Sequence, residues 1–306
     1  MPNNTTPHHN LLGIIQIMFA AALWGAFGIA GAILSKHGFS GIEVTSIRLI
    51  GASIILLLFL PFFASTFKIL LTEPKRLLFL ALQSILGMLI MTLCFLSAIS
   101  LIGPSIAVAL LYTAPIWSLI LSRLILGEGI TQTKAWLAVA AAIGVMLMLS
   151  GSGRINVLGF ILGLCSGISY ALYGVLGKRA MQGNPPSLVF FTSVFISGLI
   201  MLFFPATINT LHKLNTHFNL ITIGASLYVI FLGTLLPYFL FIKGLQKMPA
   251  ATASVFTTIE PVVGIILAAL IMKDYLHWNQ YLGIVLILST ALINALMMKK
   301  TNSKLT

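Results

Sequence analysis

Glu260 and Arg48 are the charged residues whose surroundings in the sequence could support chemistry. Glu260 lies inside a long apolar stretch, 249–272, and an acidic residue deep in a membrane helix costs about 2.5–3.5 kcal/mol on insertion scales. Such a carboxylate is expected to face a cavity or a partner. Because burial disfavours its charged form, it could exchange a proton, or it could be a structural acceptor for neighbouring hydroxyl groups.

Arg48 lies about one turn inside the end of another apolar stretch, 44–64. Its guanidinium could bind an anionic group, or it could pair with Glu260 across a cavity. Long cationic side chains near helix ends also extend to the lipid headgroups. All three interpretations of Arg48 stay open from the sequence.

Polar and aromatic side chains recur at spacings of three or four residues, which places them on common helix faces. The candidate binding residues on such faces are Trp24, Tyr112, Tyr170, Tyr173, Tyr238, Ser254, Thr257 and Glu260. Aromatic rings can line a cavity or bind cations, and for any single ring packing is the alternative role. Pro115 and Pro261 interrupt two apolar stretches near their middles, so they join Arg48 and Glu260 as candidates for coupling or gating. A kink that only aids packing is the alternative for each proline.

The elements that must position these residues are membrane helices. The chain of 306 residues is 59% hydrophobic and 7% charged, whereas soluble domains carry about 25% charged residues. Its apolar runs have roughly the 20 residues that cross a hydrocarbon core, and continuous runs favour helices over a barrel. Ten spans are predicted, at 11–33, 44–64, 77–98, 104–126, 134–151, 157–178, 187–206, 219–242, 249–272 and 278–298.

The net charge of +12 comes from 17 Lys and Arg against 5 Asp and Glu. If the N-terminus is cytoplasmic, twelve of the basic residues fall on the cytoplasmic side and five on the outer side. This excess predicts both termini in the cytoplasm and therefore an even number of spans. Basic residues placed in this way give no support to nucleic-acid binding.

The chain repeats itself at an offset of 146 residues. Pro115 falls on Pro261, and each proline is followed 13 residues later by a carboxylate, Glu128 or Asp274. Five spans per half is an odd number, so the second half would enter the membrane upside down. The predicted fold is an all-α membrane protein of ten transmembrane helices in two inverted five-helix repeats, which permits alternating access. The halves are 11–151 and 157–298.

Three glycines with a spacing of four, Gly159, Gly163 and Gly167, form a GxxxGxxxG run in the sixth span. Gly lets two helix backbones approach closely. The run predicts a helix contact within the chain, with a contact between two copies as the alternative.

Short motifs are spread over nearly the whole chain, from about residue 13 to 297. They are Ala22-Leu23-Trp24-Gly25, Ser46-Ile47-Arg48-Leu49, Thr113-Ala114-Pro115 with Glu128, Ser169-Tyr170-Ala171-Leu172-Tyr173, and Ile259-Glu260-Pro261 with Asp274. Together with the repeat, they resemble the drug/metabolite transporter superfamily in its EamA-domain family. The second half departs from that pattern, since it has no equivalent of Arg48 and has Asp274 in place of the more usual Glu. The resemblance implies a ten-helix transporter of amino acids, metabolites or drugs, without fixing the substrate.

The expected function is secondary active transport of a small solute, such as an amino acid, a metabolite or an amphipathic drug. Transport would cross the cytoplasmic (inner) membrane by alternating access, coupled to protons or to exchange. The sequence has no GxSxG, HExxH or P-loop motif, so no enzyme activity, cofactor or metal is expected. A membrane-embedded enzyme or lipid-handling protein is the alternative. The expected partners are the solute and membrane lipid, and a monomer is compatible with a fold completed by one chain.

Overall fold

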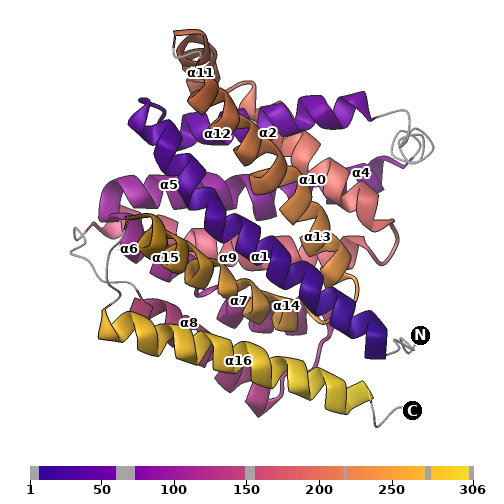
Figure 1. Ribbon diagram of the computed structural model, residues 1–306. Coiled ribbons are helices and arrows are strands. Elements are labelled where there is room, and N and C mark those ends of the chain that lie inside the picture. The colour runs from indigo at the N-terminus through magenta and orange to yellow at the C-terminus, as the bar shows by residue number, and fades with distance from the viewer. Residues whose placement is uncertain (1–6, 60–72, 149–155, 217–218, 273–276, 303–306) are drawn as a thin grey trace.

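The computed structural model describes residues 7–59, 73–148, 156–216, 219–272 and 277–302, and the regular structure in these ranges is helical. The elements are α1 (Pro7–Lys36), α2 (Gly41–Leu58), α4 (Pro74–Gln83), η1 (Ser84–Leu89), α5 (Ile90–Ile102), α6 (Pro104–Leu111), α7 (Ala114–Leu121), η2 (Ser122–Leu126), α8 (Gln132–Met148), α9 (Val157–Ala180), α10 (Pro186–Met201), α11 (Pro205–Thr216), α12 (Leu220–Ile230), η3 (Phe231–Leu235), α13 (Leu236–Leu245), α14 (Ala250–Thr257), α15 (Ile259–Met272) and α16 (Trp278–Asn302). Figure 1 shows these helices packed side by side in one bundle. Asp274 lies outside the described residues.

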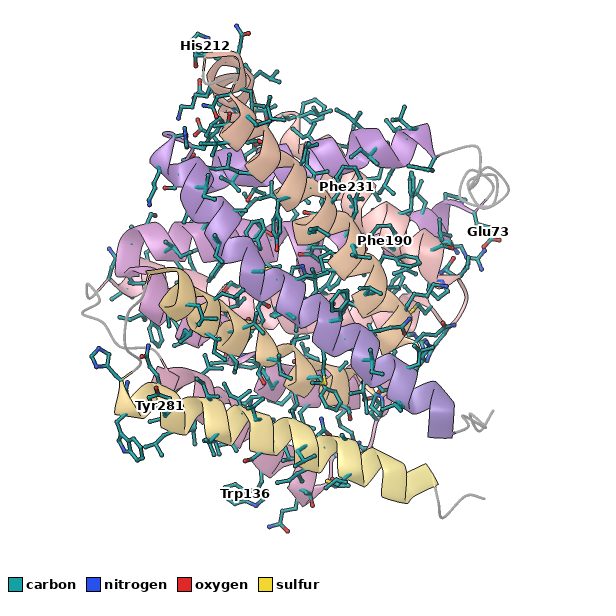
Figure 2. The ribbon with its side chains drawn as sticks, in the orientation of Figure 1. Glu73, Trp136, Phe190, His212, Phe231 and Tyr281 are labelled. Atoms are coloured by element: carbon teal, nitrogen blue, oxygen red, sulfur yellow. The ribbon has the colours of Figure 1, made fainter. Side chains whose placement is uncertain are left out.

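The outer surface of the bundle suits lipid rather than water. Eight helical stretches in the described ranges are long and apolar enough to cross a membrane: Leu11–Lys36, Gly41–Leu58, Pro74–Ile102, Ile106–Leu126, Val157–Ala180, Leu220–Leu245, Ala250–Leu267 and Trp278–Met297. Large apolar side chains such as Trp136, Phe231 and Tyr281 point away from the bundle (Figure 2). Such a surface needs lipid around it, so the chain is a multi-pass membrane protein.

Two further apolar segments differ from simple spans. Gln132–Leu147 is a shorter apolar helix, and α10 is followed by α11 after a bend of 88°. The predicted span 187–206 therefore ends at Met201 and does not run on to Pro205. Proline cannot continue a helix, because it lacks an N–H group and its ring clashes with the preceding turn. The Thr207 hydroxyl instead donates to the Met201 carbonyl at 2.6 Å, which satisfies one of the carbonyls at the end of α10.

Irregular segments recur in the two halves at the offset seen in the sequence. The π-helical segments η1 and η3 interrupt the third and eighth apolar stretches at positions that match to within one residue at an offset of 146. The break between α6 and α7 includes Tyr112, and the break between α14 and α15 lies at the equivalent Thr258. Since π segments are rare and cluster at functional sites, their recurrence is informative about the repeat.

The glycine run of α9 packs within the chain. A Cβ atom at Gly163 would lie 2.5 Å from Leu110 Cδ1, and one at Gly167 would lie 2.6 Å from the Leu110 carbonyl oxygen. A Cβ at Gly159 would meet Ile102 in the same way. These approaches are too close for any other residue, so the run joins α9 to α5 and α6.

The helix ends carry local sequence signals. At the start of α2, the Ser40 hydroxyl accepts from the Glu43 N–H while the Glu43 carboxylate accepts from the Ser40 N–H, which is a capping box. Asn156 caps α9 by accepting from the Gly159 N–H at 2.9 Å. Gly103, with φ of 84°, ends α5 in a conformation that disfavours residues with a Cβ. These signals determine where α2 and α9 begin and where α5 ends.

Candidate solute-binding cavity

A cavity of about 340 Å³ lies inside the bundle, and both halves of the chain contribute to it. It extends from the middle of the bundle to the turn between α1 and α2. Its walls are formed by Trp24, Phe27, Gly31, Ser35, Phe39, Gly41, Val44, Thr45, Arg48, Met91, Thr92, Phe95, Leu96, Ile99, Leu111, Tyr170, Tyr238 and Glu260. A volume of this size accommodates a small organic solute.

Arg48 is held inside this cavity and does not extend to the lipid headgroups, since it is only 7% exposed. Its Nη2 donates to Thr92 Oγ1 at 3.0 Å. The guanidinium carbon lies 5.5 Å from the centroid of the Phe27 ring and 6.0 Å from that of Tyr238, so cation–π attraction also stabilises the charge. The buried Nε has no hydrogen-bond partner among the described residues.

Glu260 enters the cavity from the helix break at Thr258. The break places Glu260 in the first turn of α15, where free N–H groups and the helix dipole favour a carboxylate. Arg48, Tyr112 and Tyr170 lie near enough for their charges or hydroxyl groups to act on it. Arg48 and Glu260 nevertheless form no direct salt bridge. The ion pairs found among the described residues are Arg76–Glu73 and Lys213–Glu43. The Arg48–Glu260 ion pair, one of the alternatives for Arg48, is therefore not formed in this structure.

Several polar groups around the cavity have no partner of their own. The buried Trp24 Nε1 has no hydrogen-bond partner among the described residues, and the buried hydroxyl groups of Tyr112 and Tyr170 lie near the Glu260 carboxylate but outside normal hydrogen-bond geometry. Trp24 and Tyr170 occupy equivalent positions of the two halves, and their rings meet edge to face with centroids 6.4 Å apart. Since buried polar groups are normally satisfied, unpaired groups beside two charges indicate a site prepared for a polar ligand.

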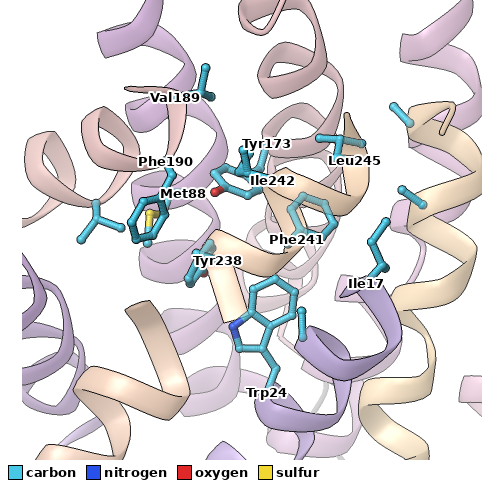
Figure 3. Close-up of a cluster of buried hydrophobic side chains, with 14 of the residues drawn as sticks. Ile17, Trp24, Met88, Tyr173, Val189, Phe190, Tyr238, Phe241, Ile242 and Leu245 are labelled. Atoms are coloured by element: carbon cyan, nitrogen blue, oxygen red, sulfur yellow. The ribbon is translucent and has the colours of Figure 1, made fainter. Parts of the chain in front are cut away.

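Trp24, Tyr173, Tyr238 and Phe241 form an aromatic cluster at the inner end of the cavity, which we call the aromatic floor (Figure 3). The Trp24 ring lies edge to face with Tyr238 at 4.9 Å between centroids. Tyr173 meets Tyr238 at 5.4 Å and stacks on Phe241 at 5.6 Å. Tyr173 is fully buried, so the cavity ends at this cluster and does not continue through the bundle.

The predicted site residues divide into two groups. Trp24, Tyr170, Tyr238, Arg48 and Glu260 line the cavity together. The others lie outside its walls. Tyr112 lies near Glu260, and Tyr173 belongs to the aromatic floor. Ser254 and Thr257 line a separate cavity of about 10 Å³ that Tyr170 also lines, and Pro115 and Pro261 lie beside the helix breaks.

Thr92 is a contact of Arg48 that was not among the predicted site residues. Thr92 is 44 residues from Arg48, and no local pattern distinguishes it from other hydroxyl residues of the spans. Phe27, another contact of Arg48, lies one helical turn after Trp24 on α1, and this spacing predicts it as a cavity-wall residue, in agreement with its place in the lining.

Comparisons with known proteins agree with this geometry. The model of the EamA-like transporter family matches the chain twice, over residues 11–150 and 157–296. The chain belongs to the EamA-like transporter family. It is therefore a membrane transporter, and the family identity favours transport over enzyme activity.

Individual relatives of this EamA-like transporter carry similar names. The inner membrane transporter YicL of Salmonella typhimurium is 28% identical over 298 residues, which is 93% of this chain and 95% of YicL. The transporter YetK of Bacillus subtilis is 24% identical over 307 residues, which is 94% of this chain and 88% of YetK. One crystal structure of a protein superimposes with a TM-score of 0.72 at 15% identity, covering 97% of this chain and 99% of that one, and it supports the fold alone.

Proposed function

We propose that this EamA-like protein is a secondary active transporter of small solutes that carry a cationic and an anionic group together, of which amino acids are the simplest. The observation that carries this proposal is that Arg48 and Glu260 face one cavity without pairing with each other. An uncompensated charge is costly in a low-dielectric site. A zwitterion would supply both countercharges at once, so its binding would remove both costs.

The recognition of such a solute follows from the groups that are free. The carboxylate would accept a hydrogen bond from Arg48 Nε, while Glu260 would accept from the ammonium group. Trp24 Nε1 and the Tyr170 hydroxyl would serve a further polar group of the solute. The aromatic walls would hold an apolar side chain and would exclude water from the charges.

Transport itself would proceed by alternating access between two inverted halves, 11–151 and 157–298, with five spans each. The two family matches and the recurrence of π segments and helix breaks at an offset of 146 support this division. Ten spans result if α8 and α10 also cross the membrane, in addition to the eight long stretches. The energy would come from a proton carried on Glu260 or from a counter-solute.

The cavity would open to the outside of the cytoplasmic membrane, with both termini in the cytoplasm. The helix α1 begins and α16 ends at the same edge of the molecule (Figure 1), as an even number of spans requires. The excess of Lys and Arg on that side favours the cytoplasm. The turn between α1 and α2, to which the cavity extends, then lies at the outer face.

The charge requirement can be tested by binding. Purified protein would be titrated calorimetrically with a panel of amino acids, and each ligand that binds would be compared with its N-acetyl derivative and its methyl ester. Removing either charge should weaken binding at least about tenfold, since each loss leaves one protein charge without its countercharge. If the methyl ester binds as well as the parent, the solute is a cation and the zwitterion proposal is wrong.

Transport can be tested in liposomes with a radiolabelled ligand from that panel. We expect saturable uptake or exchange that is lost in Arg48→Gln and reduced or uncoupled in Glu260→Gln. Glu73→Gln is a matched control, because it removes a carboxylate that is paired with Arg76 at the surface. Flux that fails to saturate would indicate a channel, and a complete lack of flux for every ligand that binds would contradict transport.

A further inference from the structure

Opposite the cavity mouth, the turn between α13 and α14 closes the bundle. The cavity-lining residues of α1 and α2 lie in the second half of α1 and the first half of α2, whereas the first half of α1 is packed in the core. The α13–α14 turn lies at the end where α1 begins. The helices on its two sides carry Tyr238 and lead into the break before Glu260. Any opening of the cavity at this end has to move the turn.

Lys178 of α9 holds the first part of this turn. Its ammonium group donates to the Leu245 carbonyl at 3.1 Å and also to the Met248 carbonyl. These are carbonyl groups at the C-terminal end of α13, where a cation is favoured by the helix dipole. Lys178 belongs to the same helix as Tyr170, which lines the cavity.

Glu128 holds the second part of the turn from the other half of the chain. It follows η2, and its Oε1 accepts from the Ala250 N–H at 3.3 Å, at the N-terminus of α14. A carboxylate is favoured there by the free N–H groups and the dipole. Lys178 lies close enough for its charge to interact with Glu128. The second oxygen, Oε2, is buried and has no partner, so the carboxylate is held by fewer bonds than it could make.

We propose that Glu128 and Lys178 are the gating residues of the closed end: Lys178 shapes the α13–α14 turn, and the contact of Glu128 with that turn must break when the cavity opens there. This inference rests on the proposed alternating access. Glu128 comes from the first half, whereas Lys178 and the turn come from the second, so relative motion of the halves moves Glu128 away from both the turn and Lys178. The contact of Glu128 with the turn is a hydrogen bond of 3.3 Å, which is long for an N–H···O bond and can therefore break reversibly.

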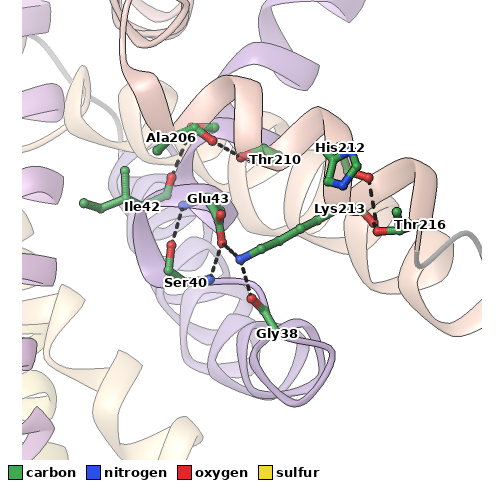
Figure 4. A network of polar contacts seen from close by, with 10 residues as sticks. Gly38, Ser40, Ile42, Glu43, Ala206, Thr210, His212, Lys213 and Thr216 are labelled. Atoms are coloured by element: carbon green, nitrogen blue, oxygen red, sulfur yellow. Dashed lines mark hydrogen bonds and ion pairs between the residues drawn. The ribbon is translucent and has the colours of Figure 1, made fainter.

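The cavity mouth has a similar arrangement that provides a matched control (Figure 4). Lys213 of α11 donates to the Gly38 carbonyl at 2.7 Å and pairs with Glu43 at 2.8 Å. Glu43 in turn caps α2 through Ser40. This pair also joins a turn between two helices, but it lies at the open end. Breaking it should leave the closed end closed.

The proposal can be tested by the reactivity of a buried cysteine near the closed end. Ser118 is 1% exposed and lines the cavity of about 10 Å³ that Ala250 also lines. Ser118→Cys would be introduced after replacement of Cys94 and Cys165, the free cysteines of the described residues. Its rate of reaction with a small methanethiosulfonate reagent would be measured in liposomes. Glu128→Gln and Lys178→Gln should each raise the rate at least about fivefold by populating the state open at this end.

The controls separate gating from loss of folding. Glu43→Gln should leave the rate within about twofold of the reference. Each variant would be used only as a monodisperse fraction, and Glu128→Asp, which keeps the charge, should react like the reference. An unchanged rate in Glu128→Gln, or an equal rise in Glu43→Gln, would overturn the proposal. No solute is needed, so a failure of this test is distinguishable from a failure of the binding and transport assays.

Discussion

The charge of Arg48 is stabilised by three helices rather than by a carboxylate. Phe27 comes from α1, Thr92 from α5 and Tyr238 from α13, and each contributes a ring face or an oxygen. Thr92 is itself fixed, because its hydroxyl donates to the Met88 carbonyl at 3.0 Å. A cation held in this way keeps its orientation while its attraction for an anion is not neutralised.

Thr92→Val should therefore weaken solute binding without unfolding the protein. The substitution keeps the shape and removes the acceptor for Arg48 Nη2, a hydrogen bond to a charged group worth about 1.5 kcal/mol, which corresponds to roughly tenfold in affinity. Calorimetric titration with the best ligand would measure the change. Thr92→Ser keeps the hydroxyl and should bind within about twofold of the wild type. Equal affinities for the Val and Ser variants would show that Thr92 does not position Arg48.

The importance of Arg48 and Glu260 could be predicted from the sequence because a charge inside an apolar stretch needs a compensating environment. Their separation could not be predicted in this way. Whether two such groups pair depends on how far the packed helices hold them apart, and that distance is set by contacts as remote in sequence as Thr92 and Arg48. The unpaired state of Tyr112 and Trp24 is likewise a property of the packed bundle.

At the scale of elements, the two helix breaks and the π segments η1 and η3 have different origins. Pro115 and Pro261 follow the breaks closely, and proline cannot continue a helix, so these breaks were predictable. The segments η1 and η3 contain no proline. Each holds a glycine against an aromatic residue of the other half, Gly87 against Tyr173 and Gly233 against Phe27. These π segments are therefore associated with tertiary packing, and no local sequence pattern predicts their positions.

Gly87→Ala should destabilise the protein through this contact. The added Cβ would lie 2.6 Å from Tyr173 Cα, and backbone cannot move aside as a flexible side chain can. Overpacking of this kind costs about 1–3 kcal/mol, so thermal unfolding in detergent should shift to lower temperature. Gly28→Ala on α1 is the matched control, because nothing lies within 4 Å of its Cβ position and Ala favours helix over Gly by about 1 kcal/mol. A Gly87 variant as stable as the Gly28 variant would contradict the close approach.

At the scale of the whole molecule, the charges and the cavity are arranged along one axis. The open mouth lies at the α1–α2 turn, the aromatic floor lies at the inner end of the cavity, and the Lys178 and Glu128 contacts lie at the far end. Apolar run lengths and the repeat predicted the helices that make this axis. Which end is open could not be predicted, because it depends on a balance between two packings of the same sequence rather than on any one segment.

The proposed orientation in the membrane leads to a test on intact cells. Gln182 is exposed in the turn after α9, beside Lys178 and Arg179, and Asn215 is exposed on α11 beside the cavity mouth. In a background without Cys94 and Cys165, Asn215→Cys should react with a membrane-impermeant maleimide added to intact cells. Gln182→Cys should react only after permeabilisation, because basic residues collect on the cytoplasmic side. The reverse pattern would place the mouth in the cytoplasm, and the same cavity would then load solute from inside the cell. Reaction of both cysteines in intact cells would contradict the assignment of these two turns to opposite faces and, with it, the odd number of spans between them.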